Sequence, residues 1–190
     1  MSKFERAFVP RHAGYIASRC YALGVYWASS AAVAAIDTIY FYPFVLPAPI
    51  SFTSGSMRVA TGGAGSAVKA GIWANSLVSN RPLGAPLYKD NTGVATTASG
   101  VVAIALGSGS LEAGVMYWWG SKFTGTLPSM NSLASQETTT AFFAGLASSA
   151  GIGAAAYAYA DTYANSMPTI AEGGSFTNPA TGAPVGFLNT

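Results

Sequence analysis

The residues that could form a catalytic nucleophile and its base are few in this chain of 190 residues. His12 is the only histidine and Cys20 is the only cysteine, and an irregular stretch separates them. Such a pair is catalytic only if the fold holds the imidazole against the thiol, which an irregular stretch does not do. We therefore interpret His12 as a surface residue and Cys20 as a small buried hydrophobic residue without an intrachain disulfide.

The carboxylates are scattered singly along the chain, at Glu5, Asp37, Asp90, Glu112, Glu137, Asp161 and Glu172. A glycoside hydrolase needs two carboxylates at a defined separation, and a metal site needs ligands at a characteristic spacing. The sequence shows neither arrangement, although carboxylates from separate strands could still meet. The segments "TGGAGS" and "GSGSLEAG" lack the lysine and hydroxyl residue of a phosphate-binding loop. We expect no enzymatic activity, no cofactor and no metal.

Aromatic residues are the more informative candidates. The segment "MYWWGSKF" places Trp118 and Trp119 next to each other on a predicted strand, so one of them points away from the core. A tryptophan in that position stacks on a ligand such as a sugar ring or lies in a subunit interface. Tyr26 and Trp27 have the same two interpretations. We favour an interface or the core for these residues because aromatic side chains are enriched in interfaces.

The elements that would position these residues are strands. Segments 56–61, 67–74 and 100–106 alternate with a period of two, and the turn "TGGAGS" predicts that the first two form a hairpin. Gly, Pro, Asn and Asp punctuate the chain roughly every ten residues, as in a β-sandwich. We predict a mainly-β fold, a jelly-roll-like antiparallel β-sandwich, because the uneven turn lengths disfavour a closed barrel.

One predicted strand raises the question of what covers it. The segment "TIYFYPFVLPAP", Thr38 to Pro49, alternates as a strand should, but both of its faces are apolar or aromatic. A strand of this kind needs a partner on each face. The second partner could be another layer of the same chain, a membrane or a neighbouring copy of the protein.

Composition limits the class of protein. Only 8% of the residues are charged, so an exposed monomer is poorly protected against association. The uncharged run 141–160 is long enough to cross a bilayer, but it is rich in Gly, Ser and Ala and has no flanking Lys or Arg, so we expect no membrane insertion. The basic residues are too few for nucleic-acid binding. Pro10, Arg11, His12 and Arg19 interrupt the N-terminal region, so we expect no signal peptide and synthesis in the cytoplasm.

We divide the chain into three predicted parts. Residues 1–20 are an N-terminal docking arm, residues 21–167 are the β-sandwich domain, and residues 168–190 are an extended C-terminal tail that could run over a neighbouring subunit. The basic residues of the arm are Lys3, Arg6, Arg11 and Arg19. Such an arm lies on an acidic partner surface or is a solvated terminus.

Several segments follow one another in a recognisable order: "SRCYALG", "IYFYPFVLPAPISF", "MRVATGGAGSAVKAGIWAN", "GAPLYKD", "GVVAIAL" and "LEAGVMYWWG". This series resembles the β-sandwich modules of tailed-bacteriophage virions, as found in head-fibre, tail-fibre and capsid-decoration proteins. The resemblance covers roughly residues 17–123 and the tail, and it does not extend over residues 132–164.

The resemblance implies a homotrimer on the outside of a virion, in contact with coat or tail protein. Such a trimer would cover the second face of the apolar strand, and we expect its subunit interface to contain Tyr40, Tyr42, Phe44 and Leu46. The function that follows is a non-enzymatic decoration protein or short spike. The alternative is a host-glycan-binding domain or carbohydrate-active enzyme with Trp118, Trp119 or Trp27 at the glycan.

Overall fold

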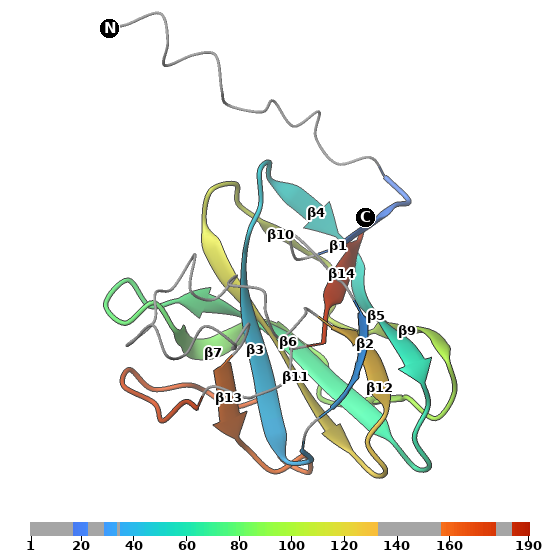
Figure 1. Ribbon diagram of the computed structural model, residues 1–190. Coiled ribbons are helices and arrows are strands. Elements are labelled where there is room, and N and C mark those ends of the chain that lie inside the picture. Colours follow the sequence, from blue (N-terminus) through green and yellow to red (C-terminus); the bar gives the residue numbers. More distant parts are fainter. Residues whose placement is uncertain (1–16, 23–28, 34, 133–156, 178–183) are drawn as a thin grey trace, which may run out of the picture.

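The computed structural model describes residues 17–22, 29–33, 35–132, 157–177 and 184–190 (Figure 1). Within these residues the chain forms strands β1 to β14 and no helix. The strands make two large antiparallel sheets with a shared apolar core. The prediction of a mainly-β antiparallel sandwich is confirmed.

Sheet A is built around β5. In spatial order its strands are β9 (Gly100–Ile104), β5 (Ser54–Thr61), β14 (Gly186–Asn189) in line with β12 (Ser129–Ser132), and β1 (Cys20–Ala22) in line with β2 (Ser29–Ala32). The middle of β5 pairs with β9 along one edge and with β14 along the other.

Sheet B contains the aromatic strands. In spatial order they are β13 (Tyr157–Ala160), β3 (Thr38–Val45), β11 (Met116–Thr124), β6 (Ala67–Asn75), and β7 (Pro82–Lys89) with β8 (Val94–Ala95). A separate two-stranded ribbon consists of β4 (Ile50–Phe52) and β10 (Gly109–Leu111).

The strand pairing is nested. β2 pairs with β12, β3 with β11, β5 with β9 and β6 with β7. Among these eight strands the first therefore pairs with the last, the second with the seventh, and so on inward. The members of sheet A and sheet B come from alternate levels of this nest, so the chain crosses repeatedly between the two sheets.

One sequence prediction is wrong for this reason. Segments 56–61 and 67–74 belong to β5 and β6, which lie in different sheets and do not pair as a hairpin. The "TGGAGS" turn carries the chain from one sheet to the other. A Cβ atom on Gly63 of this turn would collide with the carbonyl oxygen of Thr126, so a side chain has no room at this crossing.

The main core lies between the sheets. From sheet B it receives the even-numbered residues of β3 and β6 and the odd-numbered residues of β11, as the alternation of a strand requires. Sheet A contributes buried residues such as Met57, Val59, Ile104, Met130 and Leu188. Tyr42 reaches across this core, where its hydroxyl accepts a hydrogen bond of 2.6 Å from the backbone N–H of Gly186.

The outer face of sheet B is also covered by the same chain. Ile39, Phe41, Trp73 and Trp118 lie on this face and are fully buried. Their cover is the segment that follows β13, which contributes Met167, Ile170 and the partly exposed Phe176 to a second apolar cluster. The apolar strand at residues 38–45 therefore has both faces filled within one chain.

The expected subunit interface is corrected by this arrangement. Tyr40, Tyr42, Phe44 and Leu46 are all buried in the main core, so they offer no surface to a neighbouring protomer. The opposite face of the same strand does not need a neighbour either. The homotrimer stays a prediction, and this strand no longer supports it.

The predicted C-terminal tail is part of the sandwich wherever the structure describes it. β14 lies between β1 and β5 in sheet A, and the carbonyl and N–H of Gly84 in β7 pair with Ile170. The boundary predicted at residue 168 is therefore not a boundary in the packing. The N-terminal side is tied to the same place, because Cys20 of β1 is opposite Asn189 of β14.

Candidate functional site

Two lysines face each other on the outer face of sheet B. Lys69 of β6 and Lys122 of β11 are in register, and so are Gly71 with Gly120 and Trp73 with Trp118. The two strands thus present the same three residue types to one face in mirrored order. Both lysines are buried, at 6% and 0% exposure, which is rare for this residue type unless its charge is paired.

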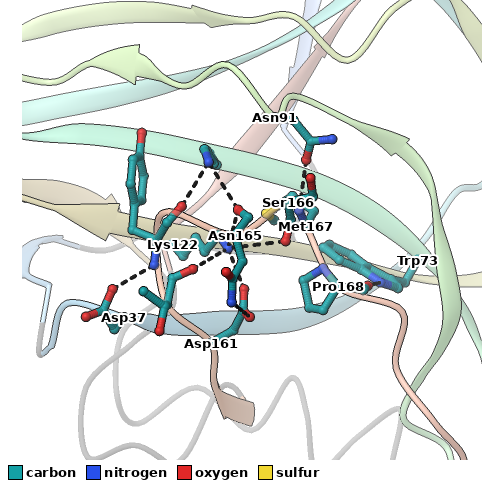
Figure 2. A network of polar contacts seen from close by, with 12 residues as sticks. Asp37, Trp73, Asn91, Lys122, Asp161, Asn165, Ser166, Met167 and Pro168 are labelled. Carbon is teal, nitrogen blue, oxygen red and sulfur yellow. Dashed lines mark hydrogen bonds and ion pairs between the residues drawn. The ribbon is translucent and has the colours of Figure 1, made fainter.

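The ammonium group of Lys122 binds the segment 161–166 that crosses above it (Figure 2). It forms an ion pair with the carboxylate of Asp161. It also donates to the backbone carbonyl oxygens of Thr162 and Asn165, both at 3.0 Å, and to that of Ser166 at 3.5 Å. Every proton of the ammonium therefore has an oxygen acceptor, as a buried charge requires.

Lys69 holds the same segment without a carboxylate of its own. Its ammonium donates to the carbonyl oxygens of Tyr163 at 2.8 Å and Asn165 at 3.1 Å, and it lies 4.7 Å from the centre of the Tyr163 ring. Burial lowers the pKa of Lys69, and the like charge of Lys122 lowers it further, while Asp161 and Asp90 act in the opposite direction.

The crossing segment has further polar attachments to sheet B and its loops. Asp37 accepts the N–H of Tyr163 at 2.7 Å, and the side-chain oxygen of Asn91 accepts the N–H of Met167 at 2.8 Å. The indole N–H of Trp73 donates to the carbonyl of Pro168 at 3.2 Å. Side chains thus bind many of the backbone polar groups of the irregular segment 161–168, while the N–H groups of Asp161 and Asn165 bond to backbone carbonyls.

This network can hold a loop, but it is not arranged for catalysis. A nucleophilic lysine must reach a substrate, whereas the amine of Lys122 is enclosed and bonded to oxygen atoms of the segment 161–166. Over the residues that the structure describes, no three His, Cys, Asp or Glu side chains come together as a metal site would need. We therefore interpret the network as structural.

Trp118 and Trp119 lie in the core, which is one of the two locations favoured from the sequence, and not on a glycan platform, which is the alternative. They point to opposite faces of sheet B as predicted, and both are fully buried. Trp118 donates its indole N–H to Asn75 at 2.8 Å and packs beside Tyr157, while Trp119 lies in the main core. Neither ring is available to a sugar.

The remaining predicted site residues fall largely outside the described ranges. Trp27 and Tyr26 lie there, as do Lys3, Arg6, Arg11 and His12. Arg19 is described and exposed, and its backbone carbonyl accepts the N–H of Thr190 at 3.0 Å. This contact places Arg19 beside the C-terminal end of the chain.

An exposed hairpin tip is the second candidate, and sequence reasoning did not single it out. Leu77 and Val78 lie in the loop between β6 and β7 and are 94% and 87% exposed. Single exposed apolar residues are common, but two adjacent aliphatic side chains that project almost completely into solvent lack a structural role in the folded chain. Such a pair is suited to contact with another molecule.

Hydrogen bonds fix the conformation of this tip, which we call the braced tip, so the exposure of Leu77 and Val78 does not come from a loosely held loop. The buried hydroxyl oxygen of Ser76 accepts the N–H groups of Val78 and Ser79, each at 3.1 Å, and the hydroxyl donates to Glu172 at 2.7 Å. Hydrogen bonds from Ser79 and Ser76 lower the pKa of Glu172. The loop is therefore attached to the same C-terminal segment that covers sheet B.

Comparisons with known proteins give no match: no family model, no curated protein and no solved structure is similar to this chain. Among the residues that the structure describes, no helix is long and apolar enough to span a membrane.

Proposed function

We propose that this chain is a non-enzymatic structural protein that acts by docking on other proteins, as a decoration or short-spike component on the exterior of a tailed-bacteriophage particle. The observation that carries the docking role is the braced tip with Leu77 and Val78. Complete burial of each side chain against a partner would contribute roughly 1.5–3 kcal/mol. The pair together could therefore supply several kcal/mol of a protein contact.

The connectivity supports the same proposal. The nested pairing of eight strands across two sheets supports a jelly-roll assignment, and jelly rolls are used by viral capsid proteins as well as by lectins and enzymes. Fold alone does not decide among these uses. The placement on a phage particle rests on the sequence resemblance. The buried lysine network supports a non-enzymatic role, because its charged groups on sheet B bind a segment of the same chain.

Host-glycan binding is the second candidate. An aromatic cluster that is partly exposed at Tyr159 and Phe176 and buried at Tyr157 favours it. The Arg81 guanidinium lies 5.3 Å from the ring centre of Tyr157 and 5.6 Å from that of Phe176, and Tyr159 packs against Phe176. An arginine held over aromatic rings is also a common feature of protein interfaces. Arg81 follows Leu77 and Val78 in the same loop, and this exposed aliphatic pair favours a protein contact over a sugar.

The test is to purify particles from a culture that produces the protein and to quantify its peptides by mass spectrometry. We expect the protein in the particle fraction, and at least tenfold fewer copies of the Leu77→Ser/Val78→Ser variant, since a loss of about 1.4 kcal/mol already weakens binding tenfold. Leu87→Ser, on the exposed side of β7, is the matched control and should bind as the wild type does. Absence of the protein from particles would contradict the virion role, whereas full occupancy by the double variant would contradict only the role of the tip.

A further inference from the structure

The strand β9 forms one edge of sheet A. Residues 100–104 pair with β5 along one side, from Gly100 opposite Val59 to Ile104 opposite Gly55. No strand in the described part of the chain pairs with the other side of β9. The carbonyl of Ile104 accepts the N–H of Leu106, and the N–H of Ala105 just beyond the strand is bonded to Asp90. The outward backbone groups of residues 100–103 have no partner strand in the described part of the chain, which is the condition for adding a further strand.

Two edges of sheet B are protected in ways that β9 is not. In β7, Pro82 and Pro86 lack a backbone N–H, Lys89 adds a charge, and the pairing with β6 shifts register. At β13, the N–H and C=O of Ala158 are both bonded to Thr177, at 2.7 and 2.9 Å. These features prevent another strand from adding to those edges.

β9 has neither a proline nor a charge. Its sequence is "GVVAI", and no charged residue occurs between Asp90 and Glu112. Val101 is 68% exposed on this strand. An exposed, uncharged edge rich in β-branched residues is the type that accepts another strand.

We propose that β9 pairs antiparallel with β9 of a second copy, so that two A sheets become one continuous sheet. The charge distribution favours a copy as the occupant, because a strand without charges meets itself without repulsion, whereas a charged partner segment would find no complementary charge on β9. A cation, Arg58, lies one strand back, opposite Val101. Across a β5–β9–β9–β5 arrangement the two Arg58 residues would be about 14 Å apart, beyond the screening length of about 8 Å at physiological salt.

The contact is small, so the association is concentration-dependent. A five-residue ladder buries less area than the roughly 1,200 Å² of a typical stable complex. The dimer therefore forms at high local concentration, as on a surface that carries many copies. The proposal does not depend on the virion role, because strand pairing follows from the edge alone.

The test is sedimentation velocity of the full chain across a hundredfold range of concentration. We expect a shift from monomer to dimer in the wild type and a monomer throughout for Val101→Lys, because an edge lysine blocks strand addition. Val115→Lys, which places the same charge at an exposed valine outside β9, is the control and should dimerise as the wild type does. A wild type that stays monomeric, or a Val101→Lys variant that still dimerises, would overturn the proposal.

A second measurement uses the wild type alone, in case Val101→Lys does not fold. Hydrogen–deuterium exchange at low and high protein concentration should show greater protection of the amides of residues 100–104 at high concentration. Protection that rises in another segment while β9 stays unchanged would assign the contact to a different surface. Neither measurement involves particles, so a result that contradicts the β9 dimer leaves the proposed docking function untouched.

Discussion

Asp161→Asn should lower the free energy of unfolding by about 3 kcal/mol. The substitution keeps the shape of the side chain but leaves the ammonium of Lys122, which has no solvent exposure, without its counter-ion. Loss of one partner of a buried ion pair costs roughly 3–5 kcal/mol. The lower end of this range applies, because three backbone carbonyls still accept hydrogen bonds from Lys122.

Thermal unfolding followed by circular dichroism measures this loss. For a chain of this size, about 1 kcal/mol corresponds to a shift of roughly 2–4 °C in Tm, so we expect a decrease of about 6–12 °C. Glu112→Gln neutralises an exposed carboxylate and should leave Tm within about 2 °C of the wild type. A double-mutant cycle with Lys122→Met should give a coupling free energy of about 1–3 kcal/mol, because the second substitution removes the charge that the first leaves unpaired.

Two results would refute the reasoning. A Tm for Asp161→Asn equal to that of Glu112→Gln would mean that the carbonyl oxygens alone stabilise the buried ammonium. Strict additivity in the cycle would mean that Lys122 and Asp161 do not interact in the folded protein. In either case the ion pair between Lys122 and Asp161 would not be what holds the segment 161–168 to sheet B.

Three further predictions concern other parts of the fold. Because the pKa of Glu172 is lowered in the folded protein, its carboxylate stabilises the fold above the ordinary pKa, and this stability is lost as the pH falls through the folded pKa. In urea unfolding, Glu172→Gln should therefore make the free energy of unfolding less dependent on pH below about pH 4.5. Gly120→Ala should cost roughly 1–3 kcal/mol in the same assay, since a Cβ atom would lie 2.5 Å from the ring of Phe41; an unchanged midpoint would show that the ring can move. Tyr42→Phe should cost about 1–3 kcal/mol because it leaves the buried N–H of Gly186 without an acceptor, and faster exchange of that amide is the independent check.

Much of sheet B could be predicted from the sequence because its strands alternate clearly. The segments at residues 38–45, 67–74 and 116–123 are strands in the structure, and the opposite orientation of Trp118 and Trp119 follows from the period of two. The pairing could not be predicted in the same way. A short glycine-rich turn is compatible with a hairpin and with a crossing between sheets, and only the packing of β5 against distant strands selects the crossing.

The sequence could not show which segment covers the outer face of the apolar strand at residues 38–45, and the reason is physical. Residues 161–168 have no periodicity, and their attachment to sheet B depends mostly on backbone carbonyl oxygens, which every residue type provides. A sequence pattern therefore could not assign this segment to that face. The same limit applies to the hairpin tip, because exposure of Leu77 and Val78 depends on where the loop projects.

One signal for the buried lysines was nevertheless present in the sequence. Lys69, Gly71 and Trp73 share a face of one strand, and "WWGSK" repeats the set in reverse order on another. Antiparallel pairing of two such strands brings like residues together, which would place two charges next to each other on an aromatic face. A chain with so few charges tolerates that arrangement only if the pair binds something electronegative. The mirrored pattern thus predicts an electronegative cover, and the carbonyl oxygens of an irregular segment of the same chain provide it.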